Sequence, residues 1–141
     1  MEQQMLIAAE ADSAEVIRCI DDCERCHRVC LRTAMTYCLE QGGEHVEPPY
    51  FRLMLACAQM CSTTADALLS AFASYEQMCA LCANICRTCA ASCERIGDME
   101  ECVEACRRCA ERCERLSGGG ERWNPAGHVE RHSSRDEAQP G

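Results

Sequence analysis

The sequence predicts an all-α protein, an antiparallel up-down-up-down four-helix bundle with a cysteine-lined core and a flexible C-terminal tail. Three observations predict this fold. Cysteines recur at helical spacing, glycine or proline lies between most of the periodic segments, and no segment alternates apolar and polar residues as a strand would. A chain of 141 residues suits one domain with one core. Four amphipathic helices with short connections therefore most simply form a bundle.

The first helix is expected from Ser13 to about Gln41, because Ser13 can cap its N-terminus and two glycines follow its end. The second helix is expected from Pro49 to about Ala71, since proline suits the first turn of a helix. The loop between them, GGEHVEPP, is short. These two helices should therefore be antiparallel neighbours.

The third helix is expected to begin at Ser74, which forms a capping-box pattern with Gln77, and to run to about Arg95. The fourth is expected to be capped by Asp98, which a glutamate follows three residues later, and to run to about Leu116. Three glycines then end the pattern. The predicted organisation is an N-terminal segment at 1–12, the cysteine-rich bundle at 13–116, and a tail at 117–141. The tail is rich in glycine, serine, proline and charge, so we expect it to be flexible.

The composition leaves a shortage of ordinary core residues. Leucine, isoleucine, valine and phenylalanine together number 21 of 141, and the net charge is −9. These values would usually indicate disorder. Cysteine, however, packs as a small buried hydrophobe, and the chain has 16 cysteines and 7 methionines. We therefore expect sulfur to fill much of the core.

Charge and hydropathy exclude several classes of function. An acidic chain with only 14 basic residues has no basic surface for nucleic acid and no attraction to anionic lipid. No apolar run approaches the ~20 residues that cross a bilayer. The first sixteen residues, MEQQMLIAAEADSAEV, contain no recognisable export signal, so we expect a cytoplasmic protein. No cofactor fingerprint or nucleophile with an adjacent base is visible, so we expect no enzyme.

Cysteines form three copies of the run CxxxCxxCxxxC and one shortened copy. In an α-helix, these four positions stay within an arc of about 60°, the narrow face that bundles bury. In the shortened copy, Thr64 and Leu68 replace the last two cysteines. The three full runs are Cys19, Cys23, Cys26, Cys30; Cys82, Cys86, Cys89, Cys93; and Cys102, Cys106, Cys109, Cys113, while the short run is Cys57, Cys61, and Cys38 and Cys79 complete the set.

Two interpretations of these rows need no metal. In a disulfide framework, bridges within a helix are excluded, because Cβ atoms at i and i+4 are about 5–6 Å apart and a disulfide needs about 3.5–4.5 Å. Bridges between helices remain open, although a cytosolic chain is kept reduced. In the second interpretation, cysteine is only a packing residue. Alanine or valine would serve that purpose without sixteen oxidisable thiols.

Soft metal ions offer the third interpretation, because thiolates select Cu(I), Zn(II) and iron–sulfur clusters. Zinc bound by four thiolates leaves two negative charges per site, whereas Cu(I) at one ion per thiolate leaves none. Buried unpaired charge costs several kcal/mol per ion, and the sequence has no lysine to offset it. A thiolate pair at i, i+4 can also hold one linear Cu(I), whereas tetrahedral zinc needs ligands from several helices. Iron–sulfur ligation favours loop spacings. Zinc is kept as the alternative.

The three full runs, the shortened run and the turn YCLEQGGEH together resemble the cytosolic branch of the bacterial copper storage proteins. The resemblance covers roughly Ala14 to Leu116. It implies a four-helix bundle whose core thiols hold many Cu(I) ions, and a homotetramer as the usual assembly. All sixteen cysteines inherit the ligand role by position. The row is expected to be thinner beside Thr64 and Leu68. Small thiols or copper chaperones would be the donors or acceptors of Cu(I).

One end of the bundle is predicted to admit copper. Antiparallel helices would bring Met35, Met54 and Met99 to the end that holds Cys38 and Cys93, with a histidine, residue 45, in the adjoining loop. Thioether and imidazole are weaker ligands that could pass Cu(I) inward.

The opposite end, with Cys19, Met78, Cys79 and Cys113, is the rival. His27, beside the first row, is interpreted as a satisfied histidine rather than a ligand. Tyr37 is expected to close one end of the core.

Overall fold

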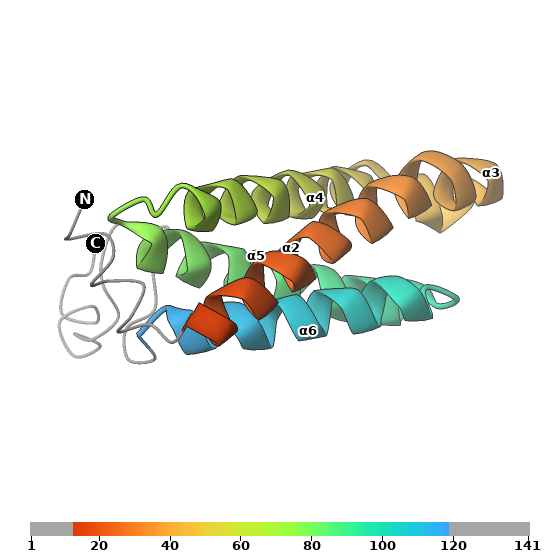
Figure 1. Ribbon diagram of the computed structural model, residues 1–141. Helices are drawn as coiled ribbons and strands as arrows, with labels where there is room; N and C mark the ends of the chain where they lie inside the picture. The colour runs from red at the N-terminus through yellow and green to blue at the C-terminus, as the bar shows by residue number, and fades with distance from the viewer. Residues whose placement is uncertain (1–12, 119–141) are drawn as a thin grey trace, which may run out of the picture.

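Four long helical segments run side by side in the computed structural model, which describes residues 13–118 (Figure 1). The predicted all-α four-helix bundle is confirmed. Each long segment packs against two neighbours, α2 on α4 and α6, and α5 on α4 and α6. The elements are α2 (Ser13–Thr33), the π-helix η1 (Ala34–Cys38), α3 (Leu39–Gln41), the 3-10 helix η2 (Gly43–Val46), α4 (Pro48–Leu69), α5 (Tyr75–Ile96) and α6 (Glu100–Leu116). The N-terminal segment at 1–12 and the expected tail from 119 onward lie outside the described residues.

The predicted capping boxes are wrong, although the helix boundaries lie close to those expected. Ser74 occupies the N-cap of α5 but makes no side-chain capping bond, because its backbone is at φ −100° and ψ 31° rather than extended. Asp98 is not the cap of α6, since that position belongs to Met99. Asp98 instead adopts the left-handed conformation, with φ 59°, in the turn after α5.

The first helix is continuous to Gln41 but contains one π-helical turn, at Ala34–Cys38. The wider hydrogen-bonded ring of a π-helix holds more residues per turn and delays the buried row by one position. The row therefore continues through Ala34 to Cys38, and both are fully buried. Tyr37 remains half-buried at the end of the core and meets His45 edge to face, with ring centroids 5.4 Å apart.

Sulfur fills the core as the composition predicts. All sixteen cysteines are free, and none is more than 1% exposed. Arginine and glutamate cover the outer faces in exposed ion pairs, such as Arg107 with Glu94 at 2.6 Å. None of the helices within residues 13–118 has the length and apolar character needed to cross a membrane.

Candidate metal centre

Contacts between α4 and α5 fix how their rows face each other. The register is constant along the helices, so the next turn of α4 places Thr64 at the level of Cys79. The pairs that set it are Tyr50 Oη to Cys93 Sγ at 3.1 Å, Met54 Sδ to Cys89 Sγ at 3.7 Å, Cys57 Sγ to Cys86 Sγ at 3.8 Å and Cys61 Sγ to Cys82 Sγ at 3.8 Å.

Contacts between α2 and α6 follow a second constant register. This register continues to Cys30 and Cys102, each of which shifts the pKa of the other. The two registers together divide the core into layers, each with one position on every helix. The α2 and α6 sulfur pairs are Cys19 with Cys113 at 3.8 Å, Cys23 with Cys109 at 3.6 Å and Cys26 with Cys106 at 3.8 Å.

We name each layer by its α4 residue, because that residue is what differs between layers. The Cys57 and Cys61 layers contain cysteine at all four positions, and we call them the inner layers. The outer layers are the Thr64 layer at one end of the core and the Met54 layer, followed by the Tyr50 layer, at the other end. The remaining members are Cys19, Cys79, Cys113 in the Thr64 layer; Cys23, Cys82, Cys109 in the Cys61 layer; Cys26, Cys86, Cys106 in the Cys57 layer; Cys30, Cys89, Cys102 in the Met54 layer; and Cys93 in the Tyr50 layer, with Cys38 near by.

Sulfur atoms gather into groups small enough to hold a metal ion, each with all its sulfurs within 4.8 Å of one another. Several groups share members, so one thiolate could bridge two ions. Each group draws on three helices, so the bundle does supply the ligands from several helices that a tetrahedral site needs. The groups are Cys23, Cys82, Cys109, Cys113; Cys26, Cys30, Cys57, Cys106; Cys26, Cys57, Cys61, Cys86; Cys61, Cys82, Cys86, Cys109; and Cys19, Cys79, Cys113.

The end of the core near Tyr50 is built differently. Thiols of Cys89 and Cys93 approach the Met54 thioether at 3.7 and 3.6 Å, and the Tyr50 hydroxyl lies 3.1 Å from Cys93. Burial and the contact with Cys93 raise the pKa of Tyr50, so its phenol keeps a proton that it can donate to a thiolate. Sequence reasoning missed Tyr50. Its spacing to Met54 and the two α4 cysteines repeats the 4, 3, 4 pattern of the full runs and could have identified it.

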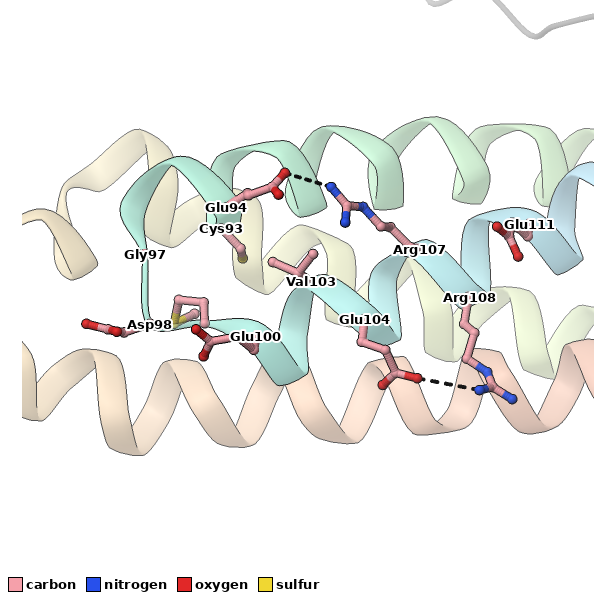
Figure 2. Close-up of a pocket in the computed structure, with 11 residues that line it drawn as sticks. Cys93, Glu94, Gly97, Asp98, Glu100, Val103, Glu104, Arg107, Arg108 and Glu111 are labelled. Atoms are coloured by element: carbon pink, nitrogen blue, oxygen red, sulfur yellow. Dashed lines mark hydrogen bonds and ion pairs between the residues drawn. The ribbon is translucent and has the colours of Figure 1, made fainter.

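Two surface cavities lie at this same end. The larger, about 530 Å³, lies along the turn between α5 and α6, and Cys93 reaches it between Glu94 and Val103 (Figure 2). The smaller, about 340 Å³, lies between the π-helical turn and the start of α6 and reaches Cys102. Met99 lines both cavities. Core thiols are therefore next to solvent-filled space at the Tyr50 end.

The predicted auxiliary ligands have different environments. His27 is satisfied, as interpreted, because its Nδ1 donates to the carbonyl oxygen of Ala58 on α4 at 2.9 Å. Met54 and Met99 are buried, whereas Met35 is 41% exposed and points away from the core. The Nε2 atom of His45 is buried and has no hydrogen-bond partner within the part of the chain that the structure describes.

Three thiols at the Tyr50 end, those of Cys38, Cys93 and Cys102, are held protonated, whereas contacts with Cys106 and Cys30 lower the pKa of Cys89 to about 6. Burial raises the pKa of Cys38 to about 11. Contact with Cys30 lowers the pKa of Cys102, but contact with Cys93 and burial outweigh it and bring it to about 11. For Cys93, contact with Cys102 lowers the pKa, while contact with Cys89 and burial raise it to about 12. A metal ion that binds these sulfurs must therefore displace protons.

In the inner layers, contacts between neighbouring thiols raise the pKa of some and lower the pKa of others. Contacts with Cys106 and Cys109 raise the pKa of Cys86 well above its ordinary value. The pKa of Cys82 is lowered, because Cys109 and Cys113 can donate to its thiolate. The thiols of an inner layer therefore do not all hold their protons equally strongly.

A four-helix bundle whose buried thiols form metal-sized groups has the ligand set of a soft-metal-binding protein. Residues 12–118 match the model of the copper storage protein family. The chain belongs to this family.

Similar proteins agree with this assignment. The structure of the Nmul_A1745 protein from Nitrosospira multiformis is 46% identical, with a TM-score of 0.74 over 75% of this chain and 97% of that one. The Cu(I)-bound copper storage protein BsCsp3 of Bacillus subtilis is 30% identical, with a TM-score of 0.68 over 73% of this chain and 98% of that one. The uncharacterized cysteine-rich protein YhjQ of Bacillus subtilis strain 168 is 33% identical over 53% of this chain and 68% of its own length.

Proposed function

We propose that the protein stores many Cu(I) ions as thiolate complexes in its core and so buffers cytoplasmic copper. One observation carries this proposal, namely that sixteen buried free thiols line a single continuous core in overlapping groups. All sixteen cysteines are the proposed ligands. A Cu(I)-bound relative of the same fold supports the choice of ion.

Charge favours the monovalent ion. Each Cu(I) that replaces one thiol proton leaves the core neutral, whereas each zinc ion held by four thiolates leaves two negative charges. In a core without lysine, such charge would cost several kcal/mol per ion. The sharing of Cys26, Cys57 and Cys61 between groups also suits bridging thiolates better than separate sites.

Copper would enter at the Tyr50 end. Both cavities there reach a core thiol, through Cys93 and Cys102. Met54 and Met99 offer soft thioethers beside them, so an incoming Cu(I) would meet weak ligands first. The rival entrance, at the Thr64 layer, remains the alternative.

Zinc storage is the second candidate function, and one observation favours it. The structure gathers four buried sulfurs from three helices in several places, which is the ligand set of a tetrahedral zinc site. These four-sulfur groups overlap, however, so at most two of the four can be occupied at the same time without sharing a sulfur. A zinc protein of this kind would bind few ions.

The proposed partners are small thiols or copper chaperones that donate or accept Cu(I), with no role for nucleic acid or a membrane. A homotetramer is the proposed assembly. Exposed apolar side chains at Leu31, Met35 and Leu39 lie along one stripe of the first helix and would suit a contact between copies of the chain. As a storage protein, it would not act as an enzyme.

The test is an anaerobic titration of the reduced, metal-free protein with Cu(I) in the presence of a strong Cu(I) chelator. Storage predicts tight binding well beyond about four ions per chain, approaching the number of thiols. The same protein is then offered Zn(II) in competition. Saturation at four or fewer tight sites, or displacement of copper by zinc, would contradict the proposal.

A further inference from the structure

The Thr64 layer is the one layer with a cluster of three thiols and no sulfur on α4. Its members, Cys19, Cys79 and Cys113, are each 0% exposed, and their sulfur atoms lie within 4.8 Å of one another. The fourth corner belongs to Thr64, whose hydroxyl is fully buried and has no hydrogen-bond partner among residues 13–118. This corner is therefore polar and unsatisfied.

A single ion held by all three thiolates must be trivalent to leave the layer neutral. One Cu(I) bound by all three would leave two negative charges, and one Zn(II) would leave one. A trivalent ion leaves none, and a neutral complex is the one that a buried apolar site tolerates best. The three-thiol layer is thus matched to a thiophilic element in its +3 state.

Geometry selects among such elements. Trivalent arsenic binds three sulfurs as a shallow pyramid and keeps a lone pair on the open side. The inner layers offer four sulfurs, whereas the Thr64 layer offers three and none on α4, which matches the three-coordinate ion. We propose that Cys19, Cys79 and Cys113 form a binding site for trivalent arsenic, taken up as arsenous acid.

The binding reaction is balanced without an oxidant or reductant. Arsenous acid, As(OH)3, reacts with three Cys–SH groups to give As(S–Cys)3 and three water molecules. Each As–O bond breaks as an As–S bond forms, and each thiol proton leaves with a hydroxide as water. Arsenic stays in the +3 state and sulfur in the thiol state. Uncharged reactants give uncharged products, so no charge is buried.

The site lies at the end of the core opposite the two surface cavities. Leu68 follows Thr64 on α4 and Leu116 follows Cys113 on α6, so these two side chains, each 7% exposed, make the outer end of the site apolar. Arsenous acid is small and uncharged and would reach the site through this apolar end. The inference does not depend on copper storage, because it uses only the thiols of one layer.

The experiment adds one equivalent of arsenite to the reduced, metal-free full chain under anaerobic conditions. Native mass spectrometry counts bound arsenic, and ultraviolet absorbance reports As–S bonds. The decisive variant is Cys79→Ser, and Cys86→Ser is its matched control. Both positions are fully buried on α5, but Cys86 belongs only to four-thiol groups. Circular dichroism verifies that each variant is helical, and Cys113→Ser replaces any Cys79 variant that is not.

We expect the wild type and Cys86→Ser to bind the first equivalent alike and Cys79→Ser to lose affinity about tenfold or more. Thr64→Cys, which adds a sulfur at the fourth corner, should also weaken this binding. The inference is overturned if the wild type binds no arsenic, if Cys79→Ser binds it unchanged, or if Cys86→Ser loses it equally. Copper titrations of the same variants report on storage separately.

Discussion

The Thr64 and Met54 layers differ from the inner layers at a single helix, α4. In the Cys57 and Cys61 layers all four positions are cysteine, and three of the four four-thiol groups contain one or both of these residues. In the Met54 layer the other three helices still supply cysteine, yet Cys89 and Cys102 belong to no metal-sized group. The α4 cysteines thus link the four-thiol groups of the inner layers to one another, whereas the groups at the Thr64 end form without a sulfur from α4.

The largest expected effect comes from the α4 cysteines. Replacing both Cys57 and Cys61 by serine should reduce Cu(I) capacity by more than about two ions per chain, because the thiols left behind lose their bridging partners. Cys38→Ser removes a thiol outside the groups and should cost about one ion at most. Anaerobic Cu(I) titration measures both. Equal losses per deleted thiol would show that α4 has no special role.

The second prediction concerns Met54, the α4 residue that fills the core in the Met54 layer. Met54 is fully buried against two cysteines, so Met54→Ala should leave a cavity and destabilise the metal-free protein by about 2–5 kcal/mol. Met54→Leu, which keeps the volume but not the sulfur, should cost less than about 1.5 kcal/mol. Chemical denaturation measures these differences. If Met54→Leu delays copper uptake while the fold stays intact, the thioether has a role in entry as well as in packing.

The third prediction is a pH dependence at the Tyr50 end. The folded protein raises the pKa of Cys38 from 9.0 to about 11, so folding favours the protonated thiol. This contribution to stability is complete below pH 9 and is lost as the pH rises towards about 11. Denaturation midpoints of the metal-free protein should therefore fall over this range. Cys38→Ala should flatten the fall, and an unchanged profile in that variant would contradict the assignment.

Copper binding should show the opposite dependence. Because each Cu(I) replaces a thiol proton, the apparent affinity should increase with pH throughout the range below the pKa values of about 11 and 12 at this end. Competition with a chelator at several pH values measures the slope. A pH-independent affinity would mean that the thiols are already ionised in the metal-free protein.

The smallest expected effect is at Thr64. Its buried hydroxyl has no partner within the described residues, and an unsatisfied buried hydroxyl costs about 1–3 kcal/mol. Thr64→Val keeps the shape and removes the hydroxyl, so it should stabilise the metal-free protein by about 1 kcal/mol. Thermal or chemical denaturation measures this change. A destabilised valine variant would indicate that the hydroxyl is satisfied in solution.

Sequence periodicity predicts the fold well for a physical reason. The 4, 3, 4 spacing of each run can be buried on one side only if the segment is helical, so the four helices and their inward faces follow directly. Pairing between helices does not follow from spacing. The register that sets Met54 beside Cys89 depends on how the antiparallel helices slide, and it appears only in the structure.

Local backbone geometry is the other part that the sequence does not reveal. Ser74 and Asp98 have good capping side chains, but tight turns fix their backbones away from the extended conformation that a capping bond needs. The π-helical turn has no sequence signature, and it brings Cys38 rather than Tyr37 into the core. These backbone conformations depend on how all the side chains at each end of the bundle pack together.

The central claim is that a monovalent soft ion neutralises the thiols of this core. Counting protons tests it most directly, by adding Cu(I) to the reduced protein in a weakly buffered anaerobic solution while recording both bound copper and released acid. Storage of a monovalent ion predicts about one proton per copper up to a loading close to the sixteen thiols. Release of two or more protons per ion, with saturation at a few ions, would show that excess thiolate charge stays in the core and would contradict it.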